Sequence, residues 1–194
     1  MIRNNKTKGV RFKYVIGQER MDEIGFVPYT EFPDIEKEYS KNILDIFAQR
    51  LNKPERPDIE DYYRFWEIGK EHRQDRYYIL AHTQGLLGTD NFEFLATYHP
   101  TKNLSFVSEI CGLSHKETPA DFLKVGEELR WELEPSNKHD KHAVAVFKGE
   151  QKLGYIKIIH NRVFYNSRAK GLRIFVKSID TNGKLNRAFV KVCF

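Results

Sequence analysis

Four polar side chains of different chemistry follow one another closely in one short segment: Asn137, His139, Asp140 and Lys141. They offer an amide, an imidazole, a carboxylate and an ammonium group, which can exchange hydrogen bonds with a ligand. The segment lies between two runs of apolar residues, so we expect it in a turn between strands. Asn and Asp in such a turn also commonly satisfy their own backbone amides, and this structural role is the alternative for Asn137 and Asp140.

Catalytic and metal-binding patterns are absent from the sequence. His139 and His142 stand three residues apart, but no third ligand follows at the spacing of a metal motif, so we expect exposed histidines. The acidic pairs Glu60-Asp61 and Glu127-Glu128 resemble solvated helix starts and turns. The sequence has no glycine-rich phosphate loop, and no Ser/His/Asp or Cys/His arrangement for nucleophilic catalysis can be recognised in it. We therefore expect a protein that is not an enzyme, with no metal and no cofactor.

The positive charge of the chain is concentrated in its last quarter. The whole sequence carries +5, and residues 1–100 carry −2, whereas residues 148–194 contain eleven Lys or Arg and only two Asp or Glu. A folded segment with an excess of +9 usually marks an anion-binding surface, most often for nucleic acid. A solvated face that keeps the protein dispersed is the alternative.

Targeting signals and cysteine usage favour a cytoplasmic protein. No apolar stretch is long enough for a membrane span, and the first residues lead into no signal-peptide core, so we expect no membrane contact. The two cysteines, Cys111 and Cys193, form no CxxC pair, which fits a reducing compartment.

The C-terminal half predicts an antiparallel β-domain. Apolar and polar side chains alternate at residues 107–111 and 129–134, as they do in half-buried strands. Two hairpins follow, 143–147 with 153–156 and 172–179 with 185–192, and the second contains the strong turn signal Asn182-Gly183. Residues 158–170 are expected to form one helix between the hairpins.

The N-terminal half predicts a small α+β unit. Apolar residues alternate at 10–16 and 24–27, which predicts a hairpin, and helical spacing follows at 35–51, 58–66 and 75–87. We place a boundary near Thr101, which divides the chain into residues 1–100 and 101–194.

The segment 134–146, together with 152–156, resembles the HIRAN domain over about residues 104–194. The family pattern begins with an acidic residue and Pro, which are followed by an Asn-Pro-x-Asp-Lys turn. An alternating strand comes next, and then a hairpin whose second strand contains a glycine. The positions that match its spacing are Asn137, Asp140, Lys141, Ala143, Val144, Val146, Gly154 and Ile156. Lys138 and His139 depart from it, because the family commonly has Pro and an aromatic residue there. Gly154 is expected to serve backbone geometry alone.

The resemblance implies an OB-like β-barrel that binds DNA and captures the 3′-hydroxyl end of a single strand, in DNA processing, repair or defence. Asp140 would accept a hydrogen bond from that hydroxyl and repel a terminal phosphate. His139 would stack on the terminal base, while Tyr155, Lys157 and Arg162 would contact the last phosphates. Asn137 and Lys141 complete the expected DNA-binding set.

The N-terminal unit is similar, more weakly, to the N-terminal subdomain of HipA-type toxin kinases. The similarity rests on residues 32–34, 47–51 and 79–85, and the chain has no kinase core. It implies a second function, an accessory or antitoxin-like partner of a HipA-type kinase or other effector in a toxin–antitoxin system. The aromatic residues at 62–66 could form a groove for such a partner or a nucleic-acid platform, or could be core.

Overall fold

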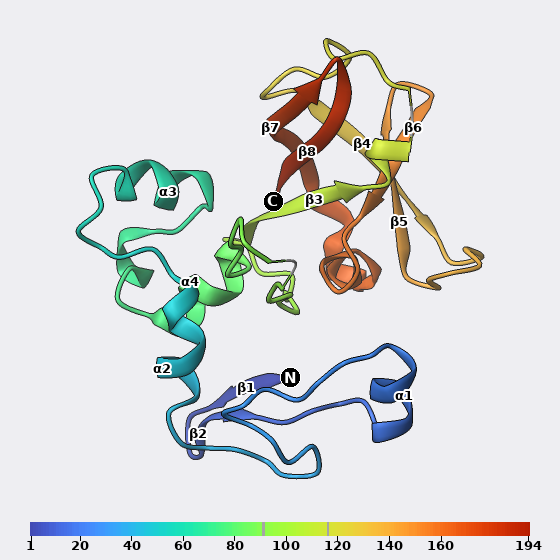
Figure 1. Cartoon of the computed structure of the whole chain (residues 1–194). Helices are drawn as coiled ribbons and strands as arrows, with labels where there is room; N and C mark the ends of the chain where they lie inside the picture. The colour runs from blue at the N-terminus through green and yellow to red at the C-terminus, as the bar shows by residue number, and fades with distance from the viewer. Residues whose placement is uncertain (91, 116) are drawn as a thin grey trace.

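The computed structural model describes residues 1–90, 92–115 and 117–194. A small N-terminal unit, made of a hairpin and short helices, lies beside a β-barrel formed by the C-terminal half (Figure 1). This is the α+β architecture that the sequence predicted. None of the helices in the described residues is both long and apolar enough to cross a membrane.

Six antiparallel strands close the barrel in the order β3-β6-β5-β4-β7-β8. Their bounds are β3 (Ser105–Cys111), β4 (Glu128–Glu134), β5 (Ala143–Lys148), β6 (Gln151–Ile156), β7 (Arg173–Asn182) and β8 (Lys184–Cys193). Both predicted hairpins, β5 with β6 and β7 with β8, are confirmed. Alternate residues point inward, so Phe106, Val144, Ile174 and Val190 are completely buried in one apolar core.

Gly154 lies where two strands approach each other closely. It sits on β6 opposite the end of β3, and a Cβ atom there would lie 2.2 Å from the carbonyl oxygen of Cys111. No side chain fits at that distance from a backbone atom. The prediction that this glycine serves backbone geometry is therefore confirmed.

The single helix expected at 158–170 is instead two short 3₁₀ helices, η4 (His160–Tyr165) and η5 (Ser167–Gly171). Asn166 separates them because its backbone is extended and its side chain accepts a hydrogen bond from the amide of Arg168 (3.0 Å). A third 3₁₀ turn, η3 (Leu113–His115), follows β3. The prediction of a continuous helix was wrong.

The predicted N-terminal hairpin was wrong in its pairing. The strand β2 (Gly9–Phe12) pairs with β1 (Ile2–Asn5), which precedes it in the sequence. Residues 24–27, the predicted partner, form no strand. The Asn5 side chain accepts hydrogen bonds from two amides of the intervening turn, and Gly9 has a positive φ of 67°. A short helix, α1 (Gln18–Glu23), occupies the position of the predicted turn.

Short helices complete the N-terminal unit. They are α2 (Ile43–Phe47), η1 (Ala48–Arg50), α3 (Ile59–Phe65), η2 (Lys70–His72) and α4 (Arg76–Thr83). The helix predicted from residue 35 begins only at Ile43, because Tyr39 bridges to Phe12 and Asn42 adopts a left-handed conformation. The helices predicted near 58–66 and 75–87 are present, the second ending at the left-handed Gln84.

The aromatic residues at 62–66 connect the two units. Tyr63 and Trp66 are buried, and the rings of Phe65 and Trp66 pack edge-on against Phe189 of the barrel, with centroids 5.7 and 5.9 Å away. Their cluster also contains Val107 of β3. The stripe therefore belongs to the core between the units.

Two histidines are buried in this region. His160 Nδ1 lies 3.0 Å from the hydroxyl of Ser108, and its ring packs near Tyr98. His82 lies 3.1 Å from the carbonyl of Tyr78 through Nδ1. Burial disfavours the charged imidazole and lowers the pKa of His160 to about 3 and the pKa of His82 to about 4.

Replacing Gly154 by alanine should destabilise the barrel by about 1–3 kcal/mol, because the added methyl group forces β3 and β6 apart. Gly88→Ala is the matched control, since no atom lies within 4 Å of the added Cβ and its φ is not positive. Urea unfolding of both variants measures the effect. Equal free energies of unfolding for the two variants would contradict the close approach.

Lowering the pH from 7 to 5 should destabilise the fold by roughly 1–2 kcal/mol for each buried histidine. The unfolded chain binds protons at His82 and His160 below about pH 6.5, whereas the folded chain stays neutral there until about pH 4 and 3. Proton binding therefore favours unfolding throughout this window. Urea unfolding measures the free energy of unfolding at pH 7 and at pH 5. The difference between the two values should be smaller for His160→Gln than for the unchanged protein. Equal differences for the two proteins would contradict this account.

Candidate nucleic-acid interface

The loop between β4 and β5 is held by a hydrogen-bonded network on its barrel side. Asn137 Nδ2 donates to Glu134 Oε2 (2.8 Å) and to the Tyr155 hydroxyl (3.1 Å). That hydroxyl donates to Glu134 (2.7 Å), and Lys152 Nζ donates to Glu134 Oε1 (2.9 Å). Hydrogen bonds from Asn137, Tyr155 and Lys152 lower the pKa of Glu134 to about 2, so it remains an anion at neutral pH.

Asn137 shapes the loop from within. Its Oδ1 accepts hydrogen bonds from the amides of His139 (2.9 Å) and Asp140 (3.2 Å), while its Nδ2 donates to Glu134 and Tyr155. The structural role considered for Asn137 is therefore the one observed. The Tyr155 hydroxyl is engaged in the same network, so both residues position the loop.

Asp140 ties the loop to η4. Its Oδ1 accepts a hydrogen bond from the amide of His142 (2.9 Å), and its Oδ2 accepts one from Asn161 Nδ2 (2.6 Å). The side chain keeps 23% of its surface exposed. A carboxylate oxygen can accept a second hydrogen bond, so both oxygens of Asp140 retain acceptor capacity toward solvent.

Rings reinforce the contact between the loop and η4. The His142 ring packs edge-on against Tyr165, with centroids 5.2 Å apart, and the Tyr165 hydroxyl donates to the carbonyl of Ala143 (3.0 Å). His139 projects as an exposed residue at the tip of the loop. The loop and η4 thus contact each other through side chains of both segments, and both lie on the same side of the barrel (Figure 1).

Lys157 does not lie on this surface. It is 9% exposed and pairs with Glu93 of the N-terminal unit and with Glu109 of β3 (3.3 Å). Its Nζ also donates to Oε1 of Gln84 (3.3 Å). A lysine withdrawn from water is stable only when it is paired, and here the pairing joins the two units. The predicted phosphate contact by Lys157 was wrong.

Most of the basic C-terminal stretch is neutralised by acidic residues elsewhere in the fold. Eight of its eleven cations form ion pairs: Lys148 with Glu127, Lys152 with Glu134, Lys157 with Glu93 and Glu109, Arg173 with Glu128, Lys177 and Lys191 with Glu67, Lys184 with Glu117, and Arg187 with Glu109. The excess of +9 along the sequence is therefore not an excess of +9 on one face.

Three cations of the stretch, Arg162, Arg168 and Lys170, are exposed and have no ion pair with any described residue. All three lie on η4 and η5. Lys138 and Lys141 on the adjoining loop are likewise exposed and unpaired within the described part of the chain. We call these five residues the free-cation patch. Sequence analysis named Lys141 and Arg162 as DNA contacts but missed the other three. Arg168 and Lys170 had only their membership of the basic stretch as a signal, and Lys138 stood out only as a departure from the family pattern.

Metal binding has no support in this region. Among the described residues, no group of three or more His, Cys, Asp or Glu side chains could hold a metal ion. His139 and His142 therefore have no third ligand among the described residues.

The C-terminal half of the chain has matches in two comparisons with known proteins. Residues 103–191 match the family model of the HIRAN domain. Among solved structures, the crystal structure of the HIRAN domain of human HLTF is similar at a TM-score of 0.36 and 15% sequence identity, over 45% of this chain and 74% of that one. No match was found among curated proteins.

The family match leaves the whole N-terminal unit, residues 1–100, outside its bounds and gives no support to a HipA-like unit. Within its bounds it includes the loop, η4, η5 and all six strands except the last residues of β8. Residues 103–191, which contain nearly all of the closed barrel, therefore match the HIRAN domain.

Proposed function

We propose that this barrel binds DNA through the free-cation patch and captures the 3′-hydroxyl end of a single strand, as a binding module without catalytic chemistry. The observation that carries the proposal is the location of the free charge. Cations elsewhere in the basic stretch are neutralised, whereas Arg162, Arg168 and Lys170 remain free beside the loop of the HIRAN-like motif. Lys and Arg side chains that neutralise phosphates release the counterions condensed on the nucleic acid, and this release supplies a large share of the binding free energy.

Asp140 supplies a means to distinguish the end of a strand. A free 3′-hydroxyl can donate a hydrogen bond to its carboxylate, whereas a terminal phosphate would be repelled by the like charge. Asn161 and the amide of His142 hold both oxygens in place, so no side-chain ordering is required on binding. Surrounding cations would hold the phosphates that precede the terminal nucleotide.

Rings for the terminal bases are present beside Asp140. His139 is exposed, and His142 and Tyr165 are half-buried. Stacking on such rings is worth about 1–3 kcal/mol per base and tolerates any sequence. The process that such capture would serve is DNA processing, repair or defence.

Replacing Arg162, Arg168 and Lys170 together by glutamine should weaken binding of single-stranded DNA at least about tenfold and reduce its salt dependence. If each residue contacts one phosphate, the slope of log K against log salt should fall in magnitude by about two, at about 0.7 per contact. Fluorescence anisotropy at several salt concentrations measures both. A control protein with Lys41, Lys53 and Lys102 replaced by glutamine loses the same charge from exposed positions outside the patch. Equal slopes for the two proteins would contradict the proposal.

Asp140→Asn should abolish the preference for a 3′-hydroxyl over a 3′-phosphate. The unchanged protein should favour the hydroxyl about tenfold or more, because a hydrogen bond to a charged acceptor contributes about 1.5–3 kcal/mol. The variant should fold, since the buried Oδ1 of Asn161 has no hydrogen-bond partner among the described groups and its amide can rotate to accept from Asn at position 140.

Asp180→Asn removes one exposed carboxylate from the β7–β8 hairpin and serves as the matched control. Anisotropy of 5′-labelled oligonucleotides that differ only at the 3′ end measures the preference. If Asp140→Asn keeps the preference of the unchanged protein, Asp140 does not read the 3′ end.

A further inference from the structure

The first thirteen residues carry five Lys or Arg and no acidic residue. The net charge of −2 for residues 1–100 conceals this segment. It forms the β1–β2 hairpin, which lies outside the region that matches the HIRAN domain.

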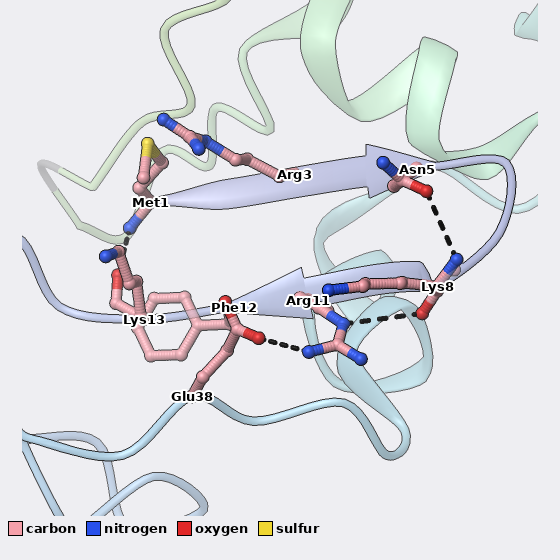
Figure 2. A pocket seen from close by; sticks show the side chains of 9 residues that line it. Met1, Arg3, Asn5, Lys8, Arg11, Phe12, Lys13 and Glu38 are labelled. Carbon is pink, nitrogen blue, oxygen red and sulfur yellow. Dashed lines mark hydrogen bonds and ion pairs between the residues drawn. The ribbon is translucent and has the colours of Figure 1, made fainter.

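The hairpin has one apolar and one cationic face. Ile2, Val10 and Phe12 pack into the core of the N-terminal unit. Since side chains alternate along a strand, Arg3 and Arg11, which are directly paired in the ladder, project from the other face. Figure 2 shows that face, with Lys8 and Lys13 beside the two arginines around a shallow pocket.

Little in the protein neutralises this face. Glu38 is the single carboxylate among the described residues that line the pocket, and it pairs with Arg11. Arg3, Lys8 and Lys13 are exposed, with no ion pair to any described residue. Like charges directly opposite each other in a ladder are destabilising, so the pairing of Arg3 with Arg11 is a cost that an anion would relieve.

The cations are arranged in a row. Arg11 lies on β2 and Lys13 comes directly after the strand, where its amide donates to the carbonyl of Met1 (3.0 Å). Two residues of extended chain separate their Cα atoms by about 7 Å, close to the spacing of consecutive phosphates along a nucleic-acid strand. A compact anion would need donors that converge on one point, whereas these side chains are distributed along the ladder (Figure 2). The arrangement suits a linear polyanion.

We propose that the cationic face of the β1–β2 hairpin binds the phosphate backbone of the nucleic-acid strand whose end the barrel holds. This inference rests on the proposed function. The ion pairs of Lys157 with Glu93 and of Lys191 with Glu67 (2.7 Å) tie the N-terminal unit to the barrel. Both cationic surfaces are therefore held on one connected framework, and binding at one raises the effective concentration of the strand at the other.

The test compares three variants of the full chain: Arg3, Lys8 and Lys13 replaced by glutamine; Arg162, Arg168 and Lys170 replaced by glutamine; and the control with Lys41, Lys53 and Lys102 replaced. All altered residues are exposed, and thermal unfolding checks that each variant folds. Anisotropy is measured with single-stranded oligonucleotides of six and thirty nucleotides and with polyglutamate, at several salt concentrations.

The hairpin variant should bind the thirty-nucleotide strand about tenfold more weakly, with a salt slope smaller by about two, and should bind the six-nucleotide strand as the control does. Binding of the long strand equal to that of the control would overturn the hairpin inference alone. A hairpin variant that loses polyglutamate but keeps DNA would assign the face to an acidic protein instead. If the variant with Arg162, Arg168 and Lys170 replaced binds both strands like the control, the proposed function of the barrel fails. Weaker binding of the long strand by the hairpin variant would then still show that the hairpin binds nucleic acid.

Discussion

The structure depends on the burial of Lys157 between the two units. An ammonium group that leaves water must find opposite charge, and Lys157 finds it in Glu93 before the barrel and Glu109 within it. Glu67 acts in the same way toward Lys177 and Lys191 of the barrel. Because these pairs join the N-terminal unit to β3, β7 and β8, much of the positive charge of the C-terminal stretch is used to hold the protein together.

The same constraint decides where a polyanion can bind. Ion pairs cover the cations of β5 to β8, and the cations of the basic stretch that stay free, Arg162, Arg168 and Lys170, all belong to the free-cation patch. The loop from β4 reaches this patch because Asn137 folds it and Asp140 fastens it to Asn161. An acceptor for a hydroxyl, aromatic and imidazole rings, and free cations thus meet on the loop, η4 and η5.

Much of the barrel could be predicted from the sequence, because alternation and the Asn182-Gly183 turn act locally. The N-terminal hairpin could not, since the turn signal of Asn5 and Gly9 competed with an equally regular apolar pattern further along. Asp140 and Lys141 were found through their motif. The burial and ion pairing of Lys157 could not be predicted, because its acidic neighbours lie 48 and 64 residues away in the sequence. Charge counted along a chain does not show which cations are paired in space.

The central claim is that nucleic acid binds where the cations are free and not where they are paired. Amide chemical shifts of the ¹⁵N-labelled protein, followed during titration with a single-stranded oligonucleotide that ends in a 3′-hydroxyl, test it most directly. The account predicts shifts at residues 138–142 and 160–170, with little change around Lys177, Lys184 and Arg187. Shifts that are confined to the paired cations of β7 and β8, or that are spread evenly over the barrel, would contradict it.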